Sequence, residues 1–483
     1  MKLKGENQMT SEELLEKLQE IQKNKCETQI LELKSAEKGC PSRLYDTLSS
    51  FSNQDNGGII IFGVDEKQDY LEVGVYDAQD IQKKINEQCL QMEPVVRPVL
   101  TVAEKQGKFF VAAEIAAIDI AERPCYYKGR GRLKGSYTRI GDSDEPMTEY
   151  EIYSYEAYRK KYQDDVRAVP RATLAALDQN ALAKYLILLK EGKPNLAKLA
   201  DENIYELMSI TRADAVTLSS VFLFSPYPQA YFPQLCITAI VVPGDEIGTV
   251  DKDGARFLDN VRIEGPIPLM LEEALQFVKR NMRHKTIINS ETGKREDKTD
   301  YPITAVREAI LNALVHRDYS IHTEGMPIQI IMYEDRMEIR NPGGIYGRMS
   351  IDQLGKVQAD TRNPVLASAL EVLGLTENRY SGIPTIRREM KAHNLMPAEF
   401  LDERGSFIVK FYKKAVAAHD DNNAIVEFCK TPRSRQELCE FLGVKTATYA
   451  IKQYVQPLIE SGRIKLLFPD APKSSKQRYY SVQ

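Results

Sequence analysis

A carboxylate and a carboxamide lie one helical turn apart in the segment 301–320, YPITAVREAILNALVHRDYS. Glu308 and Asn312 are four positions apart, so a helix places them on the same face. The amide oxygen of Asn312 can ligate Mg²⁺, and the carboxylate of Glu308 can orient or deprotonate an attacking water. The pair suits an ATP site, although the spacing alone also fits an ordinary amphipathic helix.

Three carboxylates near the start of the chain form a second candidate site. Glu27 precedes the strand-like stretch 29–34, Glu32 lies within it, and Asp65 follows the apolar run GIIIFGV. If a turn brings these strand ends together, their oxygens suit Mg²⁺ or Mn²⁺, and such an ion can activate water against a phosphodiester. From spacing alone we favour solvated strand-end charges, with Lys34 pairing with Glu32.

Cations and tyrosines alternate with glycines between residues 126 and 139. Cations can meet phosphates and tyrosines can stack on bases, so this stretch is a candidate nucleic-acid surface. An equally weighted alternative is a surface hairpin whose tyrosines pack inward. The candidate contacts are Lys128, Arg130, Arg132, Lys134 and Arg139.

The overall composition does not indicate a nucleic-acid-binding protein, so any such binding site must be a local surface. The chain has 483 residues, 43% hydrophobic and 28% charged, which suits several globular domains. Its net charge of −4 means that any nucleic-acid surface must be a local patch. The seven cysteines form no CxxC pair and the five histidines lack metal-ligand spacing, so we expect reduced thiols in a cytoplasmic protein. No signal peptide or membrane span is expected.

Periodicity and turn residues predict the elements that position these groups. The first domain is expected to contain helices at 10–24, 41–53 and 78–91 and strands at 29–34, 58–64, 98–104 and 108–116. A helix over 302–316 is followed by strands at 327–333 and 336–340. The polar stretch 287–300 is expected to be a loop.

The last part of the chain predicts three helices and a β-hairpin, the winged variant of helix-turn-helix. Its third helix would enter a major groove, and basic side chains there and in the wing would meet phosphates. A protein-binding winged helix is the alternative, but a basic wing on an acidic chain favours DNA. The candidate contacts are Lys445, Lys452, Lys473, Lys476 and Arg478.

The segments CETQILELKSA and LSSFSNQDNGGIIIFGVDE together resemble the Schlafen/AlbA-like domain, over residues 20–160. In the RNA-cleaving Schlafens, paired glutamates and an aspartate form the catalytic triad, and the resemblance places Glu27, Glu32 and Asp65 there. Those nucleases use two such lobes, whereas this chain has one, and most bacterial relatives are described as regulators. The resemblance therefore implies nucleic-acid contact, with cleavage as the minority hypothesis.

The blocks EAILNALVHRDY, DRMEIRNPGG and RNPVLASALEVLGLTENRYSGIPTIRREM resemble the divergent histidine-kinase-type (GHKL) ATPase domain of RecG-like regulators, over residues 205–412. The resemblance places Glu308 and Asn312 in the N-box. The counterparts of the adenine-contacting box are Asn341, Gly343 and Gly344, and Gly382 stands where a second glycine box binds phosphate.

This chain departs from the family pattern in two places. Asn341 replaces the adenine-contacting aspartate, and the second glycine box is reduced to Tyr380-Ser381-Gly382-Ile383. The family's His-Arg-Asp segment is present at 316–318, without a role that the sequence explains. No GxxxxGK[ST] loop occurs, so helicase activity does not follow from the resemblance.

We therefore expect an α+β multidomain protein. Its predicted parts are an AlbA-like α/β domain (1–162), a helical linker (163–204), a divergent GHKL ATPase-like α/β sandwich (205–415) and a C-terminal winged helix (420–483). The leading hypothesis is a cytoplasmic transcriptional regulator, homodimeric by analogy, in which ATP and Mg²⁺ (through Asn312) modulate contact with nucleic acid, DNA being favoured. The alternatives are a metal-dependent nuclease and an interaction scaffold with a decayed ATP site; weak ATP hydrolysis by Glu308 is left open.

Overall fold

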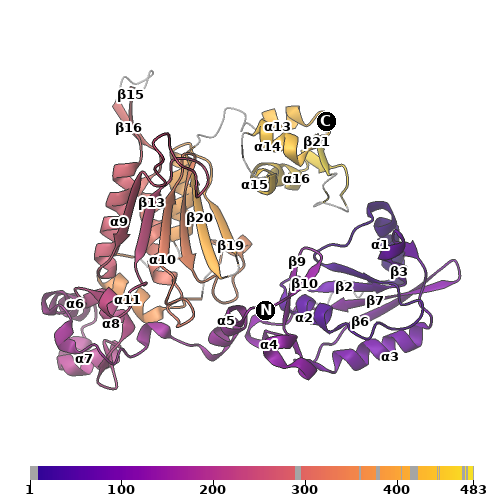
Figure 1. The fold of residues 1–483 in the computed structure, drawn as a ribbon, viewed down its shortest axis with the longest axis horizontal. Coiled ribbons are helices and arrows are strands. Elements are labelled where there is room, and N and C mark those ends of the chain that lie inside the picture. Colours follow the sequence, from indigo (N-terminus) through magenta and orange to yellow (C-terminus); the bar gives the residue numbers. More distant parts are fainter. Residues whose placement is uncertain are drawn as a thin grey trace. The chain divides into compact units, whose positions relative to one another are not determined.

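The computed structural model describes residues 9–288, 295–357, 360–376, 381–403, 405–413, 422–442, 444, 447–469, 474 and 477–481. The chain divides into two compact units (Figure 1). The continuous N-terminal part of the first unit ends at Lys161, and the second unit begins at Tyr162. Within the described residues, no helix is long and apolar enough to cross a membrane.

A four-stranded sheet of order β1-β2-β7-β6 forms the centre of the first unit. Strands β1 (Leu31–Lys34) and β2 (Gly58–Phe62) are parallel, whereas β7 (Lys108–Ile115) is antiparallel to both β2 and β6 (Val99–Lys105). These strands confirm the predicted ones.

Both faces of this sheet are covered by helices, which explains the uninterrupted apolar run in β2. Successive side chains in a strand point to opposite faces. Accordingly, Ile61 packs with helix α1 (Ser11–Asn24), while Ile60 packs with α2 (Tyr45–Asn53) and α3 (Ala78–Cys89).

A small substructure follows the sheet in the first unit. The glycine-rich basic stretch forms the short helix α4 (Gly131–Gly135), which lies between β8 (Tyr126–Tyr127) and the hairpin of β9 (Tyr137–Ile140) and β10 (Ser143–Pro146). Helix α5 (Glu149–Lys160) is the last element of the continuous N-terminal part of the first unit. A capping box at Thr148 and Glu151 fixes the start of this helix.

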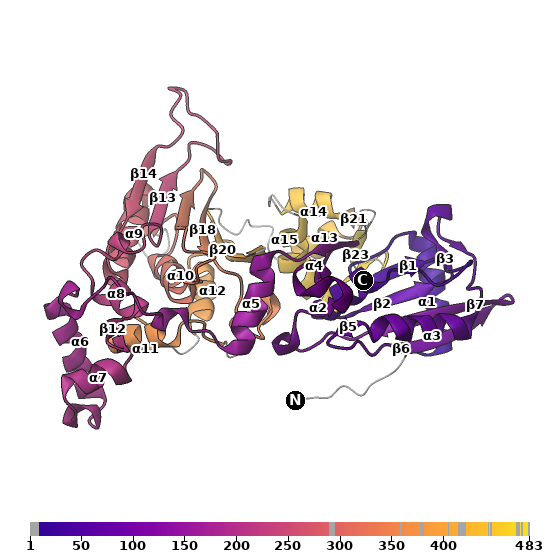
Figure 2. The ribbon, with the colours of Figure 1, turned by 60° about the horizontal axis from the view of Figure 1, so that its bottom comes forward.

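The second unit contains a six-stranded sheet of order β14-β13-β17-β18-β20-β19. Its only parallel pair among the described strands is β13 with β17. Helices α9 (Ile267–Asn281), α10 (Ile303–His316) and α12 (Gly382–Ala392) cover one face, and α10 packs against both of the others (Figure 2). The strands are β13 (Ile237–Val241), β14 (Asp259–Ile263), β17 (Ile328–Met332), β18 (Arg336–Pro342), β19 (Glu399–Glu403) and β20 (Ser406–Tyr412).

Alternation in β18 decides which of its side chains meet the helices. Arg336, Glu338 and Arg340 pair with one another on one face. Met337 and Ile339 point the other way and belong to the core shared with the helices. Asn341 has the same parity as those two apolar residues, so it too faces the helix layer.

Two expectations about segments around this sheet need correction. The predicted linker is helical, with α6 (Gln179–Gly192) and α7 (Asp201–Leu207), but Leu186 of α6 and Ile204 of α7 lie in the same core as the sheet. The described residues of the predicted loop 287–300 are mostly strand, because β15 (His284–Ile288) pairs with β16 (Arg295–Thr299). Backbone hydrogen bonds hold such a pair without apolar alternation, so its polar composition hid it.

The C-terminal segment contains the predicted helices and hairpin, with one additional strand. Helices α13 (Asn422–Phe428), α14 (Arg435–Phe441), α15 (Ala447–Ala450) and α16 (Gln456–Glu460) precede the paired strands β22 and β23, but the short strand β21 lies between α13 and α14 and gives a sheet of order β21-β23-β22. Between α15 and α16 the chain makes a π-helical turn, Ile451–Val455, just before Pro457, which has no N–H for an α-helical bond. The strands are β21 (Arg433–Ser434), β22 (Ile464–Leu466) and β23 (Arg478–Ser481).

Candidate nucleotide-binding site

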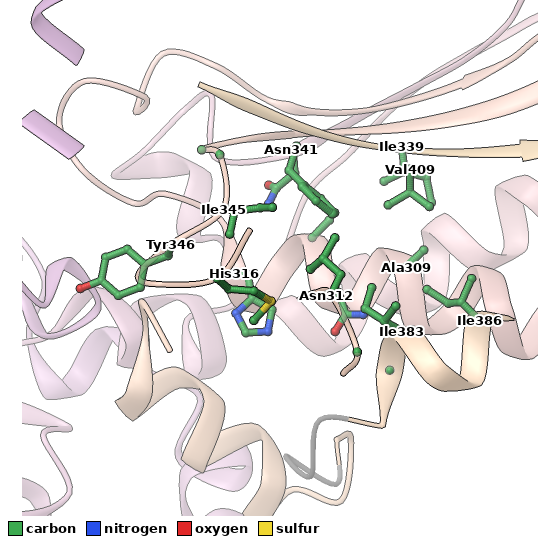
Figure 3. Close-up of a pocket in the computed structure, with 18 of the residues that line it drawn as sticks. Ala309, Asn312, His316, Ile339, Asn341, Ile345, Tyr346, Ile383, Ile386 and Val409 are labelled. Carbon is green, nitrogen blue, oxygen red and sulfur yellow. The ribbon is translucent and has the colours of Figure 1, made fainter. Parts of the chain in front are cut away.

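A pocket of about 160 Å³ lies between helix α10 and the ends of strands β18 and β20 in the second unit (Figure 3). Five of the residues predicted to bind nucleotide line it: Asn312, Asn341, Gly343, Gly344 and Gly382. They come from three separate stretches of sequence, and the fold brings them to one cavity.

Gly382 allows helix α12 to begin directly against the N-box pair. A Cβ atom at this position would lie 2.7 Å from Nδ2 of Asn312 and 3.3 Å from Oε2 of Glu308, too close for any other residue without movement. Glu308 is half-buried, and its Oε1 lies 3.2 Å from Nη1 of Arg307. The carboxylate and the amide therefore face the start of α12, whose free N–H groups favour an anion such as phosphate.

Asn341 forms the opposite wall of the pocket, at the end of β18 (Figure 3). Its side chain is only 4% exposed, and its Oδ1 has no hydrogen-bond partner among the described residues. Buried polar atoms are nearly always paired in folded proteins, and an unpaired one costs about 1–3 kcal/mol. This amide is thus suited to a partner that is not part of the chain.

The glycine turn that follows Asn341 is held by charged side chains, of which Arg362 and Asp318 are buried. Gly343 has a φ of +103°, and a Cβ there would lie 2.7 Å from Cβ of Asp318. Arg362 donates to the carbonyl of Gly344 at 3.1 Å and lies 3.6 Å from Asp318. Asp402 accepts from the N–H of Ile345 at 3.1 Å, and burial raises its pKa. These contacts fix the turn at the pocket rim.

The His-Arg-Asp segment, unexplained by the sequence, joins α10 to this turn. The N–H of Asp318 donates to the carbonyl of Pro342 at 3.0 Å, which ties the end of α10 to the end of β18. Arg317 is buried and donates to the carbonyls of Thr323 and Met326. His316 faces the cavity, where desolvation, and then Arg362, lower its pKa to about 4, so its imidazole is neutral at physiological pH.

Sequence reasoning missed His316 and the apolar walls of the pocket. His316 could have been found, because it continues the four-residue spacing of Glu308 and Asn312 along one helix face. The walls combine side chains from β18, β20, α12 and the intervening loop, which no local pattern brings together. They are Ile339, Ile345, Met349, Leu354, Ile383, Ile386, Phe407 and Val409.

The three carboxylates of the first unit do not gather into a metal site. The described residues contain no group of three His, Cys, Asp or Glu side chains able to hold a metal ion. Glu32 is buried between Lys34 and Arg139, and Asp65 caps a turn by accepting from the N–H of Lys67 at 3.0 Å. Burial, and then Glu32, raise the pKa of Glu27 to about 7. This arrangement counts against the nuclease hypothesis.

The basic stretch 126–139 needs a correction at Arg139. Its side chain is fully buried and pairs with Glu32 at 2.8 Å and Asp144 at 2.9 Å, so it cannot meet a phosphate as predicted. Tyr127 stacks on Tyr45, and Tyr137 is buried. Both agree with the alternative in which the tyrosines of this stretch pack inward. The sequence could not show this, because the partners of Arg139 are distant along the chain.

The other cations of this stretch remain nearer the surface, but most have partners. Lys128 lies 3.4 Å from Glu93, and Arg132 lies 2.9 Å from Glu156. Arg130 donates to the hydroxyl of Tyr137 at 3.0 Å. Lys134 is exposed.

Two of the C-terminal candidate contacts can be placed. The side chain of Lys452 is exposed, whereas Arg478 donates to the carbonyl of Pro432 at 3.2 Å. Lys445, Lys473 and Lys476 lie outside the described residues, as does Tyr380 of the second glycine box.

Family models match three parts of the chain. Residues 27–148 match "Schlafen, AlbA_2", and residues 325–411 match "Putative ATP-dependent DNA helicase recG C-terminal", a HATPase_c_4 family. The chain therefore combines an AlbA_2-type domain with a HATPase-type domain of the recG C-terminal class. The HATPase match begins after α10, so the assignment of Glu308 and Asn312 depends on the pocket geometry and not on the match.

Residues 421–480 match a third family, "Filamentation induced by cAMP protein Fic-like, C-terminal domain". The comparison thus does not establish the predicted winged helix, although the order of helices and strands agrees with it.

Two solved structures are also similar, and a search of curated proteins found no match. The DIP2311 protein from Corynebacterium diphtheriae aligns with 90% of this chain and 88% of its own, at 20% identity and a TM-score of 0.40. The N-terminal domain of a RecG-related protein from Nitrosomonas europaea aligns with 29% of this chain and 95% of its own, at 25% identity and a TM-score of 0.24.

Proposed function

We propose that this protein is a nucleotide-responsive, nucleic-acid-binding regulator of transcription. The HATPase-type domain would bind ATP, and the AlbA_2-type and C-terminal domains would contact DNA. The observation that carries the proposal is the convergence of Asn312, Asn341 and the glycines at 343, 344 and 382 on one apolar-walled pocket. Small-molecule sites typically combine such walls with a few polar groups.

The residues of the pocket fit a purine nucleotide. The apolar side chains suit the faces of a base, and the unpaired amide of Asn341 suits its polar edge. The phosphates would lie toward Gly382 and the start of α12. Bound Mg²⁺ would take most of its ligands from phosphate and water, as this ion commonly does, with Asn312 as the protein ligand.

The open pocket also bears on the scaffold alternative. A decayed site would be filled by side chains, whereas here a cavity remains beside Asn312 and Asn341. The DNA contact would use the C-terminal segment as a winged helix, with Lys452 exposed in the π-helical turn between α15 and α16. A nucleotide-dependent homodimer would couple the two events. A cytoplasmic location remains a prediction.

A titration of the purified full chain with ATP, with and without Mg²⁺, tests the proposal. Asn312→Ala is expected to abolish the Mg²⁺-dependent part of binding, because it removes the proposed protein ligand. The matched control is Asn203→Ala, in an exposed part of α7, which is expected to bind as the wild type does. Failure of the wild type to bind ATP under either condition would overturn the proposal.

Regulation requires a second measurement. Labelled DNA and RNA are titrated with the protein with and without saturating nucleotide, at more than one salt concentration, because phosphate contacts are salt-dependent. DNA affinity is expected to change several-fold on nucleotide binding. An unchanged affinity for both nucleic acids would leave a nucleotide-binding protein without the proposed regulatory coupling.

A further inference from the structure

The residue that faces the base edge in this pocket is an amide and not a carboxylate. A carboxylate offers only acceptors, whereas the side chain of Asn341 offers one acceptor, Oδ1, and one donor group, Nδ2. The difference decides which bases can pair with it. Adenine presents a donor at position 6 and an acceptor at N1, while guanine presents an acceptor at position 6 and a donor at N1.

No hydrogen bond fixes the orientation of this amide. Oδ1 of Asn341 is buried and has no partner within the described part of the chain. For comparison, the buried amide of Asn363 is held by two carbonyls, those of Val315 at 2.8 Å and Arg317 at 2.7 Å. A rotation by 180° about the last side-chain bond would exchange the acceptor and the donor of Asn341 without breaking any such bond.

The side chains next to Asn341 in the sheet are apolar. Asn341 lies opposite Phe407 in the register of β18 and β20, next to the pair of Ile339 and Val409. These side chains and Ile345 line the cavity and offer shape, not hydrogen bonds. Among these neighbouring side chains, Asn341 is therefore the one that can discriminate between purines at position 6.

We infer that the pocket accepts 6-oxopurine nucleotides, such as GTP and ITP, as well as the 6-aminopurine nucleotide ATP. In one orientation the amide accepts from N6 and donates to N1 of adenine. In the other it donates to O6 and accepts from N1–H of guanine or hypoxanthine. The inference rests on the proposed function, since it concerns the base of the nucleotide bound there, and it excludes a strict preference for ATP.

Calorimetric titration of the full chain with ATP, GTP, ITP and CTP, in the presence of Mg²⁺, tests the inference. The three purine nucleotides are expected to bind within about tenfold of one another, a range equal to one hydrogen bond, and CTP more weakly. If ATP binds and both GTP and ITP bind more than 100-fold more weakly, the inference fails while the proposed function stands. If no nucleotide binds, the proposed function fails as well.

The variant Asn341→Asp tests the role of the amide itself. A carboxylate has no donor, so it keeps only the hydrogen bond from N6 of adenine or from N1–H of hypoxanthine, and its second oxygen opposes N1 of adenine or O6 of hypoxanthine. The affinities for ATP and ITP are therefore both expected to fall at least about tenfold. The matched control is Asn394→Asp, an exposed residue outside the pocket, which is expected to leave both affinities unchanged. A folded Asn341→Asp protein that binds either nucleotide as tightly as the wild type would refute the inference.

A second measurement requires no variant and so does not depend on how a buried aspartate folds. Purine riboside triphosphate carries only hydrogen at position 6 and can make one of the two hydrogen bonds. It is expected to bind the wild type about tenfold more weakly than ATP. Binding as tight as that of ATP would show that Asn341 does not read position 6.

Discussion

Asp165 caps a helix that is distant from it in sequence. Its Oδ2 accepts from the N–H groups of Val365 at 2.9 Å and Leu366 at 3.1 Å, in the first turn of α11 (Pro364–Val372). Asn363, the residue at the usual capping position, makes no capping bond with its side chain. Asp165 is fully buried, and desolvation raises its pKa from 3.8 to about 6 despite the two backbone hydrogen bonds.

The raised pKa makes the stability of this region depend on pH. Because the folded state binds the proton more tightly than the unfolded state, the contribution of Asp165 is fully present below pH 3.8 and is lost as the pH rises through 6. The whole effect amounts to about 3 kcal/mol, and about 2 kcal/mol of it falls between pH 4.5 and pH 7.5. Asp165→Asn keeps an acceptor and removes the titration.

The expected result is therefore a pH-dependent difference between variant and wild type. Relative to the wild type, Asp165→Asn should gain about 2 kcal/mol of opening free energy in α11 on going from pH 4.5 to pH 7.5. Hydrogen exchange of peptides that contain Val365 and Leu366 measures this locally, which matters because a multidomain chain need not unfold in one step.

The control is Asp178→Asn, which alters an exposed cap at the start of α6, where the carboxylate accepts from Asn180 and Ala181. It is expected to leave exchange in α11 unchanged at both pH values. A difference for Asp165→Asn that is constant with pH, or that falls as the pH rises, would refute the argument that burial dominates at this carboxylate.

Two further predictions follow from the same structure. Gly343→Ala should lower stability by about 1–3 kcal/mol and weaken nucleotide binding, because its Cβ would meet Asp318. The control is Gly374→Ala, at a position with a positive φ but open space around it, which should affect stability less and leave nucleotide binding unchanged. Thermal melting and nucleotide titration measure the two effects. Arg139→Met should cost the first unit about 3–5 kcal/mol in denaturant unfolding by stranding buried carboxylates, whereas the exposed Lys134→Met should cost under about 0.5 kcal/mol.

Local patterns were sufficient to predict the groups on α10 and β18. The four-residue spacing put Glu308 and Asn312 on one helix face, and both turn toward the start of α12. Alternation along β18, with Met337 and Ile339 in the core, would likewise have placed Asn341 toward the helices. In each case the governing geometry is that of a single element, so neighbours in sequence carry the information.

Contacts between distant segments were beyond such reasoning. Arg139 has the composition of a surface cation, and only its pairing with Glu32 and Asp144 makes it a core residue. The helices of the predicted linker join the core of the second unit for the same reason, since their apolar faces do not reveal what they pack against. The unpaired state of Asn341 also depends on the absence of a donor from other described elements.

The start of α11 is where these long-range contacts meet. Asn363, immediately before it, donates to the carbonyls of Val315 and Arg317 at the end of α10, while Arg362 donates to Gly344 in the turn at the pocket rim. Asp165 holds the next residues from the other side. A nucleotide that orders the turn would thus also restrain α11 and, through Asp165, the stretch that follows Lys161. Such a connected set of buried polar contacts is a physical route for coupling only if it has two arrangements that the nucleotide distinguishes. Burial disfavours the charged form of the Asp165 carboxylate, which is therefore partly protonated near pH 6. Its contacts are for this reason the weakest of the set, and a second arrangement would begin most readily there.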